Sequence, residues 1–183
     1  RATAQESTTR GLNLGVHLQG ASLEVEGGDR DGGGGMGFRV GYGFNRIITG
    51  YVELDGVSVE SESADVFQGT WSLGHLDLGV RFHFANALRS WVPFLELAVG
   101  GRFASVSDVE ADGDRFEDVS FSGGSFSFGG GLDVYFSQTL ALDVGLKISG
   151  GEFNEVDIGA LSLNNLDIDA TSTRFKVGVV WWP

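Results

Sequence analysis

Bulky apolar residues alternate with small or polar residues in eight segments of the chain. Between Met36 and Phe44, for example, every even-numbered position carries a bulky apolar side chain and every odd-numbered position is glycine or arginine. A period of two is that of a β-strand, in which successive side chains point to opposite faces. The pattern predicts strands over Gly11–Glu24, Gly35–Phe44, Ile47–Ser58, Thr70–Phe84, Trp91–Ser105, Ser122–Phe136, Leu140–Gly150 and Ser172–Trp182.

The connections between these segments alternate in length. Asn45-Arg46, Ala85–Ser90 and Ser137–Thr139 are short, and the long ones are Val25–Gly34, Val59–Gly69, Val106–Phe121 and Gly151–Thr171. This alternation predicts an all-β fold, an eight-stranded antiparallel up-and-down barrel with both termini at the end of the short turns. We expect a single barrel domain over residues 11–183, preceded by an N-terminal tail over residues 1–10.

The charged residues of the predicted strands lie on the face opposite the bulky apolar residues. That face holds equal numbers of acids and bases, namely Glu53, Asp55, Asp77, Glu96, Asp133 and Asp143 against Arg39, Arg81, Arg102, Lys147, Arg174 and Lys176. An unpaired buried charge costs several kcal/mol, so charges inside a barrel must pair. Because the lumen of an eight-stranded barrel is filled by side chains, we expect a structural charge network and no open pore.

The alternation does not by itself say which face is inside. A soluble lipocalin-like barrel that binds an apolar ligand buries the apolar face, whereas a membrane barrel turns that face to lipid. Three features favour lipid: the polar face is rich in glycine and serine, aromatic residues gather near strand ends, and the apolar stretches have the length of a tilted membrane strand, about nine to eleven residues. The soluble barrel stays as the alternative.

The net charge of −13 belongs almost entirely to the long connections. Only Arg30 and Arg115 oppose their acids, which are, with Glu24 at the end of the first strand counted among them, Glu24, Glu26, Asp29, Asp31, Glu60, Glu62, Asp65, Asp108, Glu110, Asp112, Asp114, Glu117, Asp118, Glu152, Glu155, Asp157, Asp167 and Asp169. Such a surface argues against nucleic acid as a partner and attracts cations or basic proteins. A saline habitat would produce the same bias. The chain has no cysteine, which excludes disulfides and thiolate metal sites.

One acidic segment has the spacing of a calcium-binding loop. Asp108, Glu110, Asp112 and Asp114 stand at positions 1, 3, 5 and 7 of that motif, but Val119 replaces the glutamate at position 12. Weak Ca²⁺ binding over residues 108–119 is one interpretation. A solvated acidic loop without any cofactor is the other, and the missing glutamate favours it.

The three histidines, His17, His75 and His83, all fall on the polar face. A lipid-modifying enzyme would need a histidine–serine pair, or a similar arrangement, that faces the bilayer or the rim. Hydrogen-bonding roles inside the barrel are therefore the better interpretation, and we expect no enzyme. The lipid-modifying enzyme stays as a further alternative.

Two segments carry a resemblance to a known family. Residues 91–101 (WVPFLELAVGG) combine a proline and an aromatic residue with a strand that ends in small residues, and residues 126–148 (FSFGGGLDVYFSQTLALDVGLKI) form a glycine-rich hairpin with a short turn. Both are similar to segments of the small eight-stranded outer-membrane β-barrels of Gram-negative bacteria, of the OmpA transmembrane-domain and OmpX type.

The resemblance implies a place in the bacterial outer membrane, with the long loops outside the cell and the short turns and termini in the periplasm. It adds no catalytic residue. We expect a structural, anchoring barrel that is surrounded by outer-membrane lipid. Its acidic loops would engage a surface protein, cations or a second copy of the chain.

Overall fold

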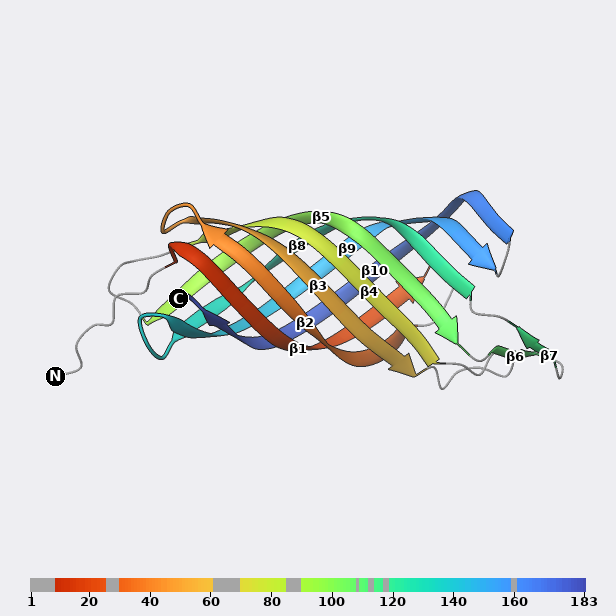
Figure 1. Cartoon of the computed structure of the whole chain (residues 1–183), viewed down its shortest axis with the longest axis horizontal. Helices are drawn as coiled ribbons and strands as arrows, with labels where there is room; N and C mark the ends of the chain where they lie inside the picture. The colour runs from red at the N-terminus through yellow and green to blue at the C-terminus, as the bar shows by residue number, and fades with distance from the viewer. Residues whose placement is uncertain are drawn as a thin grey trace.

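The structure is a computed structural model that describes residues 9–25, 30–60, 70–84, 90–107, 109–111, 114–116, 119–158 and 161–183 (Figure 1). Eight of the ten strands in the described residues close into one barrel, in the order β1-β10-β9-β8-β5-β4-β3-β2, with antiparallel neighbours throughout. These strands are β1 (Gly11–Val25), β2 (Arg30–Gly43), β3 (Ile48–Glu60), β4 (Thr70–His83), β5 (Trp91–Ser107), β8 (Val119–Tyr135), β9 (Leu140–Ile158) and β10 (Leu161–Trp181). The predicted all-β barrel is thereby confirmed.

The two ends of the barrel differ. The C-terminus and the short turns lie at the end that we call the turn end, on the left of Figure 1, and the opposite end we call the long-strand end. At the turn end, the Asn45 side chain accepts hydrogen bonds from the backbone N–H groups of Ile47 and Ile48, at 2.8 and 2.9 Å. The Thr9 hydroxyl donates to the carbonyl of Arg46 at 2.8 Å, which ties the start of β1 to the same turn.

At the long-strand end, the prediction of a loop over Gly151–Thr171 is wrong. β9 continues to Ile158 and β10 begins at Leu161, so the two strands pair along almost the whole of that segment. The period of two is interrupted in this part of the sequence, and β10 has a register shift between Asn164 and Ile168. The loops predicted at 25–34, 59–69 and 106–121 are also shortened by strands that run into them.

A further difference is a short hairpin between β5 and β8. β6 (Val109–Ala111) pairs with β7 (Asp114–Phe116) in a separate two-stranded sheet, seen at the right of Figure 1. The sequence predicts a loop here. Among the described residues, no helix is long and apolar enough to span a membrane.

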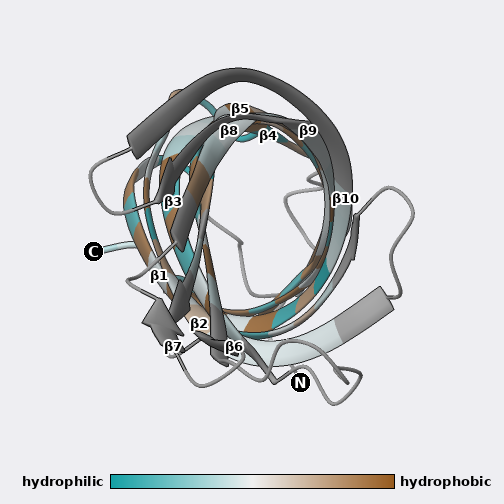
Figure 2. Cartoon of the chain, turned by 90° about the vertical axis from the view of Figure 1, so that its right-hand side faces the viewer, coloured by the Kyte–Doolittle hydropathy of each residue, from teal (hydrophilic) through white to brown (hydrophobic). Residues whose placement is uncertain are grey.

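The barrel wall separates two chemically different faces, and hydrophilic and hydrophobic residues alternate along its strands (Figure 2). The bulky apolar residues point outward and are exposed, as Leu18 (69%) and Leu78 (63%) illustrate. The charged residues at the alternate positions of these strands are buried where their burial is described, as Arg39 (4%) and Lys147 (0%) illustrate. A soluble barrel with its apolar face inward is therefore excluded for this chain.

The ion-paired lumen and the candidate cation sites

All twelve charged residues that the sequence assigns to the polar face point into the lumen. None of them is more than 5% exposed: Arg39, Glu53, Asp55, Asp77, Arg81, Glu96, Arg102, Asp133, Asp143, Lys147, Arg174 and Lys176. They come from seven of the eight barrel strands, because each strand turns alternate side chains inward. We call these residues the lumen network.

Glu96 pairs with four bases of the lumen network, Arg39, Arg81, Lys147 and Lys176, at 3.0–3.5 Å. Three of these bases also pair with Glu53, at shorter distances. One of the Glu53 oxygens accepts hydrogen bonds from Lys147 at 2.5 Å and from Lys176 at 2.8 Å. The other accepts from Arg39, whose Nε lies 2.8 Å away. Three bases from β2, β9 and β10 therefore converge on one carboxylate of β3 and connect opposite sides of the barrel.

A second set of ion pairs lies around Arg81. Its guanidinium contacts Glu96 at 3.0 Å, Asp133 at 3.4 Å, and Asp143, to which it donates a short hydrogen bond. Arg39 joins this set to the first, because it also reaches Glu96 at 3.2 Å. Asp133 and Asp143 are direct neighbours in the β8–β9 register, so Arg81 separates two like charges.

The third set lies nearer the long-strand end. Arg174 donates to Asp55 at 2.5 Å, to Asp77 at 3.2 Å and to the hydroxyl of Ser149 at 2.6 Å. Lys147 contacts Asp77 at 3.3 Å and so connects this set to Glu53. Arg102 is buried at this end as well, and a Cβ atom at Gly151 would lie 2.6 Å from its guanidinium.

Aromatic side chains complete the interior. The Arg81 guanidinium lies over the Phe94 ring at 3.5 Å from its centroid, and Arg39 lies over Tyr51 at 4.4 Å. Such cation–π contacts gain strength where water is excluded. Phe94 and Glu96 are two positions apart on β5, so their side chains point to the same face of the wall. This alternation alone would have placed Phe94 inside the barrel.

An apolar cluster fills the lumen at the turn end. It contains Val92, Tyr135, Ala141, Val180 and Trp182, and the rings of Tyr135 and Trp182 stack at 5.3 Å between centroids. Tyr135 has the parity of Asp133 on β8, so the period of two puts it on the polar face, but the pattern does not predict an apolar cluster inside the barrel. The cavity beside the cluster, bordered by Asn13 and His83 among others, has a volume of about 10 Å³, which is room for about one water molecule.

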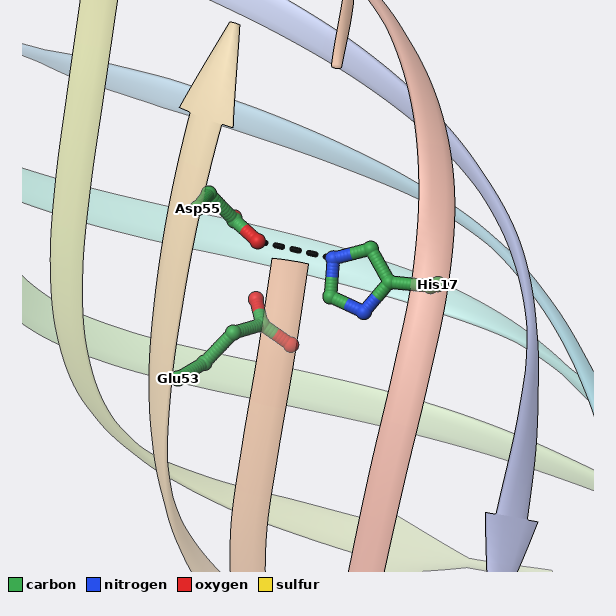
Figure 3. Close-up of side chains that lie close together, drawn as sticks. All are labelled: His17, Glu53 and Asp55. Atoms are coloured by element: carbon green, nitrogen blue, oxygen red, sulfur yellow. Dashed lines mark hydrogen bonds and ion pairs between the residues drawn. The ribbon is translucent and has the colours of Figure 1, made fainter. Parts of the chain in front are cut away.

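His17, Glu53 and Asp55 form a group with the donor atoms of a metal site, within 4.8 Å of one another (Figure 3). His17 and Asp55 are joined by a 2.7 Å hydrogen bond that passes over Gly37 on β2. However, Glu53 already contacts three bases, and Asp55 receives Arg174 at 2.5 Å. A divalent ion would have to displace or face these positive charges, so the group is better suited to an internal ion-pair role.

The predicted calcium segment is only partly described. Asp108 and Asp112 lie outside the described residues, whereas Glu110 is on β6 and Asp114 is on β7. The backbone there forms a hairpin, in which Glu110 is the register partner of Arg115. Ca²⁺ binding at this segment stays a prediction.

The three histidines lie inside the barrel wall. His17 bonds to Asp55, and His83 lies 3.3 Å from Asp133. His75 is 1% exposed and its ring nitrogens have no hydrogen-bond partner among the described residues. Within the same residues, none of the three makes a hydrogen bond to a serine.

The comparisons with known proteins agree with this geometry. A family model described as an outer membrane protein beta-barrel domain matches residues 1–181. The chain belongs to this outer-membrane β-barrel family. Among curated proteins, no sequence matches the chain significantly.

Solved structures share the fold of this outer-membrane barrel at low sequence identity. Neisserial surface protein A (NspA) is 14% identical, with a TM-score of 0.70 over 93% of this chain and 96% of that one. Ail, the attachment invasion locus protein of Yersinia pestis, is 14% identical, with a TM-score of 0.59 over 94% of this chain and 100% of that one. OprG of Pseudomonas aeruginosa is 10% identical, with a TM-score of 0.52 over 99% of this chain and 98% of that one. The apolar coat is therefore the lipid-facing surface of an outer-membrane protein.

Proposed function

We propose that this outer-membrane barrel is a non-catalytic anchor that holds an acidic surface outside the cell and binds cations or a basic surface partner there. The observation that carries the proposal is the separation of charge along the barrel. In the lumen, six acids are matched by six bases, whereas the segments around the long-strand end contain eighteen acids and only Arg30 and Arg115. The paired charges of the lumen stabilise the barrel. The acids around the long-strand end far outnumber the bases there, so most of them have no base to pair with.

The proposed orientation follows from the same asymmetry. We propose that the long-strand end is extracellular and that the turn end, with the C-terminus, is periplasmic. Strands such as β9, with 19 residues, and β10, with 21, are far longer than the nine to eleven residues or so that cross a bilayer. Their extensions reach beyond the membrane at the long-strand end only. An epitope inserted between Ile158 and Leu161 should be labelled on intact cells, and labelling only after lysis would contradict this orientation.

The partner that we propose has the opposite charge to a ligand in the structure of a similar barrel. Ail has been solved in complex with the heparin analogue sucrose octasulfate, which is a polyanion. The excess of acids in this chain repels polyanions and attracts positive charge. We therefore propose a basic partner rather than a sulfated one.

The experiment that tests the function is the binding of poly-L-lysine to intact cells that display the barrel. The test variant replaces Glu152, Glu155, Asp157, Asp167 and Asp169 by their amides. Binding should fall in this variant, and it should fall in the parent as salt is raised, because exposed charges are screened over about 8 Å at 0.15 M. Equal binding of parent and variant at low salt would contradict the proposal.

The same proposal includes weak Ca²⁺ binding by residues 108–119, at the millimolar affinity, roughly, that is typical of extracellular sites. Calorimetric titration of the parent with CaCl₂ should show this binding, and Asp112→Asn should weaken it. Identical titrations of the two proteins would leave the segment as a solvated acidic hairpin.

A further inference from the structure

The small cavity inside the barrel at the turn end is bordered by polar groups that lack hydrogen bonds. Its lining comes from β1, β2, β3, β4 and β10, together with the residue that follows β10. Four lining residues have a side-chain atom without a hydrogen-bond partner in the described part of the chain, and none of the four is more than 3% exposed: Asn13, Thr49, His83 and Trp182. Because buried polar groups are hydrogen-bonded as a rule, these atoms indicate a ligand in the cavity.

The atoms concerned match the hydrogen-bonding groups of a water molecule. Nδ2 of Asn13 and Nε1 of Trp182 are donors, and the Thr49 hydroxyl can accept as well as donate. A neutral imidazole has one nitrogen that donates and one that accepts. Neither nitrogen of His83 makes a hydrogen bond to a described residue, although Nε2 lies 3.3 Å from Asp133. Two donors and two acceptors are what a single water molecule needs.

The charges around the cavity are already paired, and this favours a neutral ligand. Arg39 and Arg81 border the cavity. Arg39 donates to Glu53 and Glu96, and Arg81 donates to Glu96 and Asp143. A halide ion would therefore add a negative charge that neither arginine of the lining is left to balance. It is also larger than a water molecule, and the volume of about 10 Å³ is enough for one water molecule.

The cavity lies at the turn end of the seam, by which we mean the pairing of the first barrel strand, β1, with the last, β10. Leu14 on β1 pairs with Trp181 on β10. Asn13 and Trp182 follow this pair toward the turn end. The backbone N–H of Trp182 donates to the carbonyl of Thr139, in the turn between β8 and β9, at 2.7 Å. A ligand bonded to the side chains of Asn13 and Trp182 would therefore extend the seam beyond its last described pair.

We propose that the cavity is a binding site for one ordered water molecule, which accepts hydrogen bonds from Asn13 and Trp182 and donates to Thr49 and His83. The water connects β1, β3 and β4 to the residue after β10, and so it fastens the seam from inside the barrel. Val180 and Trp182 belong both to the lining and to the apolar cluster, which separates the site from bulk solvent. A buried water with such partners is costly to remove.

The test uses two adjacent tryptophans as matched reporters. The full chain, labelled with ¹⁵N at the indole nitrogens, is placed in lipid nanodiscs, and nuclear Overhauser contacts between each indole N–H and water are recorded. The indole of Trp182 should contact a long-lived water molecule. That of Trp181, which is 46% exposed on the outer face, should not. The absence of this contact at Trp182, or equal contacts at the two indoles, would overturn the proposal.

Substitutions at Thr49 test whether the water is held by hydrogen bonds. Thr49→Val should reduce the water contact of Trp182 about fivefold, as the loss of one hydrogen bond predicts, whereas Thr49→Ser keeps the hydroxyl and should preserve the contact. Thr173→Val is the control, since Thr173 is half-buried on β10 and is not a lining residue. No loss in Thr49→Val, or an equal loss in Thr49→Ser or Thr173→Val, would show that the hydroxyl of Thr49 does not hold the water and would contradict the site.

Exchange of the buffer anion distinguishes a water molecule from a halide ion. Spectra of the parent are recorded in sodium chloride, sodium bromide and sodium acetate. The Trp182 indole resonance should have the same position in all three. A shift of this resonance between chloride and bromide, without a matching shift at Trp181, would show that the cavity binds a halide ion and would overturn the assignment of water.

Discussion

At the residue scale, glycine has opposite roles on the two faces of the barrel wall. Gly37 faces the lumen, and an added Cβ would lie 2.1 Å from an Asp55 oxygen and 2.3 Å from a His17 nitrogen. The absence of a side chain at Gly37 is what allows His17 and Asp55 to meet across β2. Gly20 faces outward, and a Cβ there would meet nothing within 4 Å. The sequence predicts small residues on the polar face, but it does not show which of them lies under an ion pair.

Gly37→Ala should therefore destabilise the barrel by about 1–3 kcal/mol, the usual cost of overpacking a filled interior. Gly20→Ala is the matched control on the neighbouring strand, and we expect it to change the free energy of unfolding by less than about 0.5 kcal/mol. Urea unfolding in lipid vesicles measures both. Equal effects of the two substitutions would mean that the lumen beside Gly37 has space for an additional methyl group.

The acids of the lumen network differ in how many bases depend on them. Glu53→Gln should cost about 3–5 kcal/mol, because Arg39, Lys147 and Lys176 lose a common buried counter-charge. Asp133→Asn should cost less, since within the described part of the chain Asp133 pairs with Arg81 and His83, at 3.4 and 3.3 Å. The measurement is again the free energy of unfolding. A larger loss for Asp133→Asn would show that the number of bases paired with an acid does not determine the cost of neutralising it.

At the scale of elements, the positions of the strands follow from the sequence, but some of their lengths do not. The period of two is continuous where one face meets lipid and the other meets the lumen network. Beyond that zone the period is lost, and the sequence prediction begins the last strand at Ser172, whereas β10 begins at Leu161 and has a register shift near Asn164. The cluster around Trp182 is also missed, because the pattern predicts a polar face and apolar residues replace charges at the turn end.

The extension of β9 and β10 predicts slow amide hydrogen exchange. The amides that pair across Gly151–Ile158 and Leu161–Thr171 should be protected by ladder hydrogen bonds. Hydrogen exchange followed by mass spectrometry resolves this segment. Exchange throughout it at the rate of an unstructured peptide would restore the loop that the sequence predicts.

The two adjacent tryptophans of the last strand give a second test at this scale. Trp182 is 2% exposed and stacks on Tyr135, whereas Trp181 is 46% exposed on the outer face. Trp182→Ala should cost about 3–5 kcal/mol, as for other buried aromatic residues, and Trp181→Ala should cost clearly less. Thermal unfolding in detergent micelles, where both proteins meet the same solvent, compares them. The reverse order would contradict the assignment of Trp182 to the lumen.

At the scale of the whole molecule, the alternation of side chains determines most of the account. It predicts the eight barrel strands and puts all twelve network residues on the face opposite the apolar coat, as the structure confirms. The strand order follows from the alternating lengths of the connections, and the outward position of the apolar face follows from the small residues of the polar face, the aromatic residues near strand ends and the strand lengths. The alternation cannot predict which acid pairs with which base, because Glu53 and Lys147 are 94 positions apart and meet only after the barrel closes. The partner of the acidic surface is likewise absent from the pattern, since charge defines a class of ligand and not a molecule.

The central claim is that the apolar coat lies in lipid and that the wall leaves the lipid toward the long-strand end, between Leu78 and Ser72 on β4. Because the chain has no cysteine, a fluorescent label can be placed at one position at a time. Leu78→Cys and Ser72→Cys each put the label on the outer face of β4, at positions six residues apart.

In vesicles, a label at position 78 should be quenched by brominated acyl chains and protected from iodide, while a label at position 72 should be open to iodide. Iodide quenching at position 78 equal to that at position 72 would contradict the account.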